Sequence, residues 1–210
     1  MSLYPRKKIQ YKKKKPSLPK QIKSKKPYNK YIEQVHYFKV HTSAFSPLTI
    51  DNISKKYEAY NFSLADLTNA ATYASLFDSY KILGVEFCFM PQQTANVSLG
   101  DINNAWGNTR FFSAIDYTDS GSVTSIGEIQ EYNTCIATPA LQVHKRFIVP
   151  KINDSSSAYN VPGSPWLNTS STSTNYFGLK IAVDEMQSST TTTMDYTVEC
   201  TYWMCFKNAK

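Results

Sequence analysis

Alternation of hydrophobic and polar residues runs through the chain from residue 31 onward and predicts β-strands. The strongest cases are residues 80–90 and 194–207, which keep a period of two along their whole length. Further strands are predicted at residues 35–41, 110–117, 141–149 and 176–183. We expect residues 194–207 to lie in the middle of a large sheet, because a long exposed edge strand would promote aggregation.

The two longest strands also predict which side chains share a face, because successive residues of a strand point to opposite sides. In residues 80–90, one face should carry Lys81, Leu83, Val85, Phe87 and Phe89, and the other Tyr80, Ile82, Gly84, Glu86, Cys88 and Met90. In residues 194–207, one face should carry Tyr196, Val198, Cys200, Tyr202, Met204 and Phe206.

One short helix is predicted from Leu64, with Ser63 as its N-cap and Asp66 three residues further on. Its apolar stripe is formed by Leu64, Leu67, Ala71 and Ala74. Helical periodicity is scarce elsewhere, and Ser/Thr-rich loops are expected at residues 168–175 and 188–193. Long antiparallel strands joined by such loops favour an all-β sandwich of two packed sheets.

The first thirty residues have a different composition from the rest of the chain. They hold 12 of the 23 lysines and arginines and no acidic residue, so residues 31–210 keep 11 bases against 16 acids, a net charge of −5. Lysine clusters alternate with prolines in this segment, and its apolar residues are too few to form a core. We therefore divide the chain into a disordered Lys-rich arm, residues 1–30, and a β domain, residues 31–210.

The arm has the composition of a segment that binds nucleic acid. Its cations can displace counterions from phosphates, and its tyrosines can stack on unpaired bases. The candidate nucleic-acid-binding residues are Arg6, Lys7, Lys8, Lys12, Lys13, Lys14, Lys15, Lys20, Lys23, Lys25, Lys26 and Lys30. The acidic β domain is not expected to attract DNA strongly by itself. Lys12, Lys13, Lys14 and Lys15, with Lys25 and Lys26 as a second half, also form a candidate nuclear import signal.

Catalytic and metal-binding patterns do not emerge from the sequence, so no enzyme activity, cofactor or metal site is predicted. His36 and His41 are five residues apart on a predicted strand and should point to opposite faces. His144 is interpreted as a polar histidine on a strand face. The neighbouring carboxylates Asp116/Asp119, Glu128/Glu131 and Asp184/Glu185 are interpreted as solvated turns or as a subunit rim.

Membrane insertion is not expected, because no apolar stretch is long enough to span a bilayer. The N-terminal segment also lacks the apolar region of a secretory signal, so we expect a reducing compartment. Cys88, Cys135, Cys200 and Cys205 show neither a C-x-x-C pair nor a zinc spacing, and they are predicted to be free structural thiols.

Three segments resemble the capsid proteins of circovirus-like viruses, which carry circular, Rep-encoding single-stranded DNA. Residues 77–87 (FDSYKILGVEF) resemble a strand entry of that family, and residues 143–151 (VHKRFIVPK) resemble its H-x-R-[YF]-x-x-P-K strand. Residues 195–206 (DYTVECTYWMCF) are similar to its closing strand. The arm departs from the family in having eleven lysines and a single arginine, Arg6, which keeps the charge but loses bidentate contacts to phosphate.

This resemblance implies a single jelly roll of about eight strands whose copies assemble into an icosahedral shell of about 60 subunits, the smallest complete icosahedral set. It also implies that the arm faces inward and packages a single-stranded DNA genome. The expected locations are the virion and, during assembly, the host nucleus, with an import receptor as a further partner and an unidentified receptor on the host.

Two other functions are compatible with the pattern of residues. A capsid protein of a small RNA virus or satellite also combines a basic arm with a jelly roll. A cellular nucleic-acid-binding module with a basic tail would instead be a monomer with exposed aromatic side chains on one sheet face. Particles in electron micrographs of the purified protein would exclude the monomer.

Overall fold

The structure is a computed structural model that describes residues 34–92, 109–151, 165–185 and 193–209. These residues belong to one compact unit, which begins at Glu33. Its strands are β1 (His36–Thr42), β2 (Leu48–Asp51), β3 (Lys56–Phe62), β4 (Phe77–Gln92), β5 (Arg110–Ile115), β6 (Ile136–Pro139), β7 (His144–Ile148), β8 (Leu167–Asn168), β9 (Tyr176–Val183) and β10 (Thr193–Ala209). Its helices are the 3₁₀ helix η1 (Leu64–Asp66) and the α-helices α1 (Ala70–Leu76) and α3 (Ile126–Glu131).

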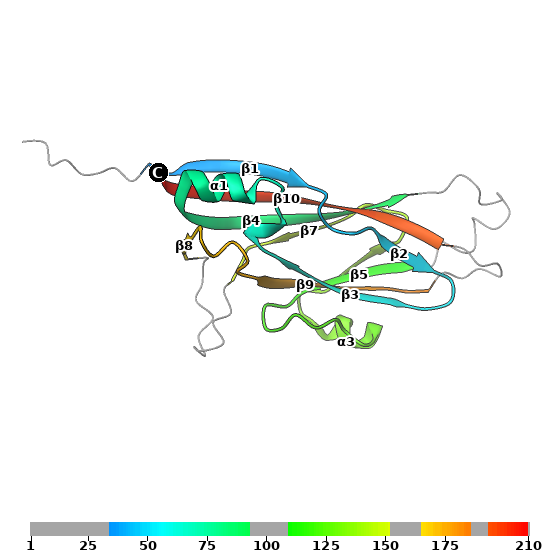
Figure 1. Cartoon of the computed structure of the whole chain (residues 1–210). Helices are drawn as coiled ribbons and strands as arrows, with labels where there is room; N and C mark the ends of the chain where they lie inside the picture. Colours follow the sequence, from blue (N-terminus) through cyan, green and yellow to red (C-terminus); the bar gives the residue numbers. More distant parts are fainter. Residues whose placement is uncertain (1–33, 93–108, 152–164, 186–192, 210) are drawn as a thin grey trace, which may run out of the picture. The chain divides into compact units, whose positions relative to one another are not determined.

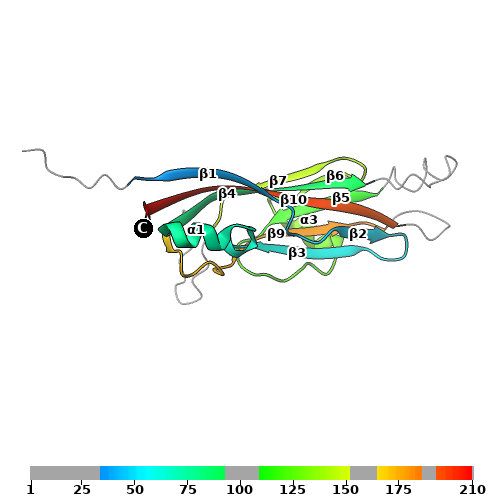
Figure 2. The same ribbon diagram turned by 45° about the horizontal axis from the view of Figure 1, so that its top comes forward.

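These strands form two antiparallel sheets that pack face to face (Figures 1 and 2). The six-stranded sheet has the order β1-β10-β4-β7, with β2 also paired to β10 and β8 to β4. The four-stranded sheet has the order β3-β9-β5-β6. Neighbouring strands are distant in sequence, as in the paired Greek keys of a jelly roll. The predicted all-β jelly roll is thus confirmed, and β2 and β8 are short additions to its eight main strands.

Strand β10 lies in the middle of the six-stranded sheet, as predicted, with β1 and β2 on one side and β4 on the other. The six side chains predicted to share one face of this strand are all buried, so this face is the inner one. Aromatic rings fill much of the space between the sheets: Phe89 of β4 lies 5.1 Å from Phe111 of β5, measured between ring centroids. The core therefore joins both sheets into one sandwich.

The predicted faces of β4 are correct only in its second half. Val85, Phe87 and Phe89 share a face as predicted, and that face is buried. Tyr80 and Ile82, which were predicted on the other face, are buried as well, whereas Leu83 is exposed. The cause is a shift of register opposite Trp203 and Met204, which pair with Gly84 and Ile82 and leave Leu83 as an extra residue. Such a bulge moves every preceding side chain to the other face.

The predicted helix is divided into two pieces. Asp66 accepts a hydrogen bond from the backbone N–H of Ser63 at 2.6 Å, but η1 ends there and α1 starts only at Ala70. Leu64 and Leu67 are buried as the pattern indicates, whereas Ala71 is exposed. Tyr73 faces the core instead and stacks on Phe206 with ring centroids 5.0 Å apart. One aromatic ring thus takes the place of the predicted alanine stripe.

Helix α3 covers the outer side of the four-stranded sheet (Figure 1). Ile129 of α3 packs with Phe112 of β5 and Ala182 of β9 in a small second core. Ser125 caps this helix by accepting a hydrogen bond from the backbone N–H of Glu128 at 3.1 Å. The sequence pattern did not predict α3, because its six residues are too few for a helical period to be recognised.

Candidate functional site

All predicted nucleic-acid-binding residues, from Arg6 to Lys30, lie outside the described residues, and so do the six lysines of the candidate import signal. The chemical groups and surfaces available in the described domain are therefore those of its histidines, carboxylates, cysteines and sheet faces.

His144 lies on a face of strand β7, in agreement with its interpretation, but this face points between the two sheets and the side chain is only 1% exposed. Its Nε2 atom is 2.6 Å from the hydroxyl of Ser113, and its Nδ1 atom is 2.8 Å from the hydroxyl of Thr138. Burial, together with the charge of Arg146, lowers the pKa of His144 to about 4. Ser113 is buried, and His144 is oriented by Thr138 instead of by a carboxylate. These residues therefore do not form an accessible nucleophile.

The other two histidines point to opposite faces of β1, as predicted. The His36 ring lies 5.3 Å from the Phe77 ring on the inner side, whereas His41 is exposed and its Nδ1 atom lies 2.9 Å from the Thr201 hydroxyl. Within the described ranges, no three His, Cys, Asp or Glu side chains are grouped closely enough to hold a metal ion.

Asp116 is 8% exposed, which corrects its interpretation as part of a solvated turn. Its Oδ2 atom lies 3.0 Å from Nζ of Lys180, which is itself 4% exposed and also contacts Asp119 at 2.9 Å. Burial alone would raise the pKa of Asp116, but hydrogen bonds from Thr118, Lys180 and Tyr132 lower it to about 2. These contacts fasten the loop that precedes α3 to β9, so the carboxylates have a structural role.

All four cysteines are free thiols, as predicted. Cys200 and Cys205 are buried, and burial raises the pKa of both. Their thiols are therefore poor nucleophiles. No helix of the described chain is both long enough and apolar enough to cross a bilayer.

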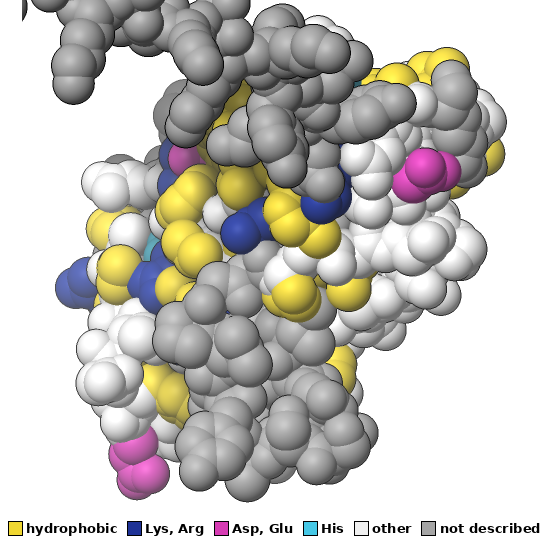
Figure 3. All heavy atoms as spheres, turned by 90° about the vertical axis from the view of Figure 1, so that its left-hand side faces the viewer, with side chains coloured by type: hydrophobic (Ala, Val, Ile, Leu, Met, Phe, Trp, Pro, Cys, Tyr) yellow, Lys and Arg dark blue, Asp and Glu magenta, His cyan; other side chains and the backbone are white. Residues whose placement is uncertain are grey.

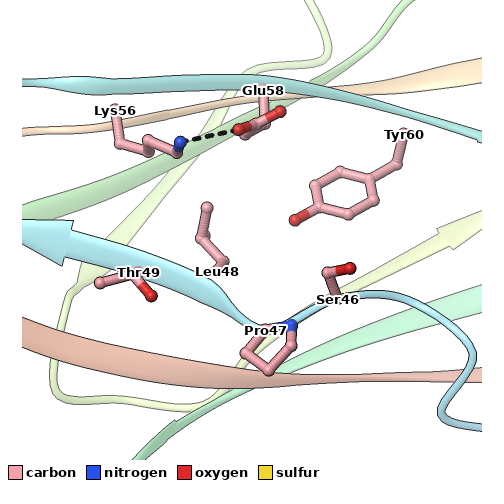
Figure 4. Close-up of a pocket in the computed structure, with 7 residues that line it drawn as sticks. All are labelled: Ser46, Pro47, Leu48, Thr49, Lys56, Glu58 and Tyr60. Carbon is pink, nitrogen blue, oxygen red and sulfur yellow. Dashed lines mark ion pairs between the residues drawn. The ribbon is translucent and has the colours of Figure 1, made fainter.

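A groove lies between β2 and β3, at the open side of the sandwich (Figure 4). Leu48 and Pro47 line it from one side, and Tyr60 extends from β3 toward them. Lys56 and Glu58 form an ion pair of 2.8 Å at its rim. The groove has a volume of about 250 Å³. Charged residues on an edge strand discourage pairing with a strand of another molecule. We assign this protective role to the Lys56–Glu58 ion pair.

The outer face of the six-stranded sheet is the most unusual surface of the domain, because exposed aromatic rings and lysines share it. Register places Lys39 of β1 beside Trp203 of β10, and Trp203 beside Gly84 of β4. Phe147 of β7 contacts Trp203 edge to face at 5.4 Å between ring centroids. Figure 3 shows the end of the sandwich where β10 finishes, with basic side chains among hydrophobic ones.

Comparison with known proteins identifies related capsid structures. The family model described as "Circovirus capsid protein" matches residues 5–210. No curated protein sequence matches the chain significantly. The BFDV capsid protein in a decameric crystal structure has a TM-score of 0.55 and 13% identity, covering 83% of this chain and 100% of that one. In its 60-mer structure the TM-score is 0.53 with 14% identity, covering 84% and 95%.

A mud crab tombus-like virus structure is similar as well, with a TM-score of 0.55 and 6% identity over 89% of this chain and 95% of that one. At such low identities the likeness of structures concerns the fold alone. The family match is different, because it extends over almost the whole sequence, including the three segments that resembled circovirus-like capsid strands. The chain therefore belongs to the circovirus capsid protein family, and it is a structural, non-enzymatic protein.

Proposed function

We propose that copies of this chain assemble into an icosahedral shell and package single-stranded DNA through the N-terminal arm. The observation that carries the proposal is the charge division: a domain of a capsid family follows thirty residues with 12 cations and no acid. Unneutralised charge of this density favours binding to a polyanion. As a member of a capsid protein family, the chain is a component of the virion.

Assembly is supported by the described domain and by its relatives. Apolar side chains are exposed at places that lie away from the core, including Ile53 between β2 and β3, Ile136 on β6 and Val143 before β7. Exposed apolar side chains that are scattered singly are normal on protein surfaces, so the relatives are the main support for assembly. The BFDV capsid protein has been solved as a decamer and as a 60-mer, and we infer a shell of the latter size for this chain.

The packaging role is tested by changing charge within the arm. Replacing Lys12, Lys13, Lys14 and Lys15 by glutamine removes four cations from a segment outside the described fold. For binding to a single-stranded oligonucleotide, the magnitude of the slope of log K against log salt should fall by about three. Each neutralised phosphate contributes about 0.7 to this slope. An unchanged slope would contradict a packaging arm.

Assembly and the nature of the cargo need separate measurements. Electron microscopy of the purified full-length protein should show closed particles at neutral pH and moderate salt, and a persistent monomer would overturn the shell. Nucleic acid released from particles should be degraded by a deoxyribonuclease and resist a ribonuclease. The reverse pattern would indicate an RNA cargo.

The same lysines support a proposal on transport. We infer that Lys12–Lys15, with Lys25 and Lys26, bind a nuclear import receptor and bring the protein to the host nucleus for assembly. In cells, a fluorescent fusion of the full chain should concentrate in the nucleus, and glutamine at Lys12–Lys15 should distribute it evenly. Nuclear accumulation that persists in this variant would contradict the role of these lysines.

A further inference from the structure

One aromatic ring on the outer face of the six-stranded sheet has an unusual support. A Cβ atom added to Gly84 would lie 2.3 Å from Cζ of Phe147, so the ring rests directly on the glycine backbone. Trp203 holds the ring from the side, at an interplanar angle of 71°. Phe147 is nevertheless 51% exposed. One surface of the ring is thus seated on the protein while the ring stays open to another molecule.

Lysines lie on the neighbouring strands of the same sheet. Nζ of Lys39 lies 5.4 Å from the centroid of the Trp203 ring, and Lys81 lies on β4 three residues before Gly84. Lys207, at the end of β10, contacts the ring of Trp166 at 4.9 Å. We call this group the aromatic–lysine surface, and it consists of Tyr37, Lys39, Lys81, Phe147, Trp203 and Lys207.

Acidic residues also occur on these strands. Glu86 of β4 and Asp195 and Glu199 of β10 point outward, and Asp78 near the start of β4 is exposed. Glu86 is the direct cross-strand partner of Phe147. Glu86 is engaged by Lys145, with a distance of 3.9 Å between Nζ and Oε1. Among the described residues, the end of the face with Lys39, Lys81 and Lys207 therefore holds three cations and one exposed carboxylate, Asp78, although residues 31–210 together have an acidic net charge.

This combination fits a single strand of nucleic acid. An exposed ring offers a platform on which a base of any identity can stack, and nearby cations neutralise the backbone. The core of a contact between two proteins is instead depleted in lysine. The surface is also close to the arm in sequence. Strand β1, which carries Lys39, starts at His36, six positions after Lys30.

We propose that the aromatic–lysine surface binds unpaired bases of the packaged single-stranded DNA, with Phe147 as the stacking platform and Lys39 and Lys81 at the phosphates. The inference rests on the proposed packaging function and extends it from the arm to the folded domain. The arm would neutralise phosphates whether or not bases are present, whereas Phe147 would contact DNA only through a stacked base.

The test compares two probes of equal length, an oligothymidylate and an abasic oligomer with the same phosphates, binding to the full-length protein at one salt concentration. Phe147→Leu should weaken binding of the oligothymidylate about five-fold or more, because stacking is lost. Its affinity for the abasic oligomer should be unchanged. Phe147→Tyr keeps the ring and should bind both probes like the natural protein.

A second variant tests the cations independently of the ring. Lys39→Gln combined with Lys81→Gln should lower the salt slope for both oligomers by about 1.4, which corresponds to two phosphate contacts. Circular dichroism checks that each variant keeps the β fold.

Three results would overturn the inference. They are unchanged binding of the oligothymidylate by Phe147→Leu, equal weakening for both probes, or loss of particles with both affinities intact. The last result would make this face a contact between copies of the chain. If the natural protein bound neither oligomer, the proposed packaging function would fail as well, so the two failures are distinguishable.

Discussion

Protonation of His144 should couple the stability of the domain to pH. The imidazole is buried between the sheets, and its two nitrogens contact the hydroxyls of Ser113 and Thr138. The Phe111 ring lies 4.5 Å away between centroids, and the charge of Arg146 on the same strand opposes a second cation. The neutral form of the imidazole is therefore the form that fits the core.

The size and sign of the effect follow from linkage. The pKa of His144 falls from 6.5 to about 4 in the folded protein, and each pKa unit corresponds to about 1.4 kcal/mol. Above pH 6.5 both folded and unfolded chains carry a neutral His144, so its contribution to stability is complete. As the pH falls from 6.5 toward 4, the unfolded chain gains a proton first. The free energy of unfolding should drop by about 2 kcal/mol at pH 5 and by about 3 kcal/mol below pH 4.

The assay is urea unfolding at a series of pH values between 7.5 and 4.5, followed by tryptophan fluorescence at one fixed protein concentration, since self-association would add to apparent stability. His144→Gln removes the titrating group and keeps a hydrogen-bonding side chain. This variant should be less stable at pH 7.5, but its stability should change with pH by about 2 kcal/mol less than that of the natural protein. Equal pH dependence in the two proteins would refute the reasoning.

Three further predictions concern stability. Lys180→Met leaves Asp116 buried without its cation and should lower the free energy of unfolding by about 3 kcal/mol. Lys55→Met breaks a largely exposed pair with Asp184 and should lower it by less than about 1 kcal/mol. Similar losses for the two variants in urea unfolding would contradict this distinction. Asp116→Asn should lose less stability than the natural protein between about pH 4 and 2, where the natural protein loses the stabilisation that the low pKa of Asp116 provides, as acid titration monitored by circular dichroism can show. Phe206→Ala removes a fully buried ring that contacts Phe38, Tyr73 and Phe77, and it should lower the free energy of unfolding by about 3–5 kcal/mol in chemical unfolding. The control Tyr37→Ala removes an exposed ring and should lower it by less than about 1 kcal/mol. A small loss for Phe206→Ala would count against the described core.

Strands that bury one complete face could be predicted from the sequence, because burial imposes a strict period of two. Residues 194–207 are the example: β10 covers these positions, and the side chains predicted to share a face are its buried inner ones. Residues 176–183 were also predicted, although β9 is buried on both faces. Strands β2 and β6 were missed because each has only four residues, too few to establish an alternation. Strand β3 was missed because most of its side chains are half-buried on both faces.

Other features depend on contacts between distant parts of the chain. The bulge at Leu83 is fixed by pairing with Trp203 and Met204, which lie more than a hundred residues away. Asp116 is buried because Lys180 of β9 reaches it, and His144 because Ser113 and Thr138 supply its hydrogen bonds from the opposite sheet. The aromatic–lysine surface was missed for the same reason, since its members come from four strands and meet only through their register.

Net charge is a poor guide to what this domain can bind, because charges of opposite sign occupy different places on it. Asp116 and Asp119 are held by Lys180, and Asp184 pairs with Lys55, so much of the acidic charge is engaged within the domain. Lys39 and Lys81 instead lie on a face where Glu86 is engaged by Lys145. A local potential of this kind attracts phosphate even when the whole domain is acidic. Charge changes in the arm should therefore weaken binding to base-containing and abasic strands alike, whereas loss of the Phe147 ring should weaken only the former.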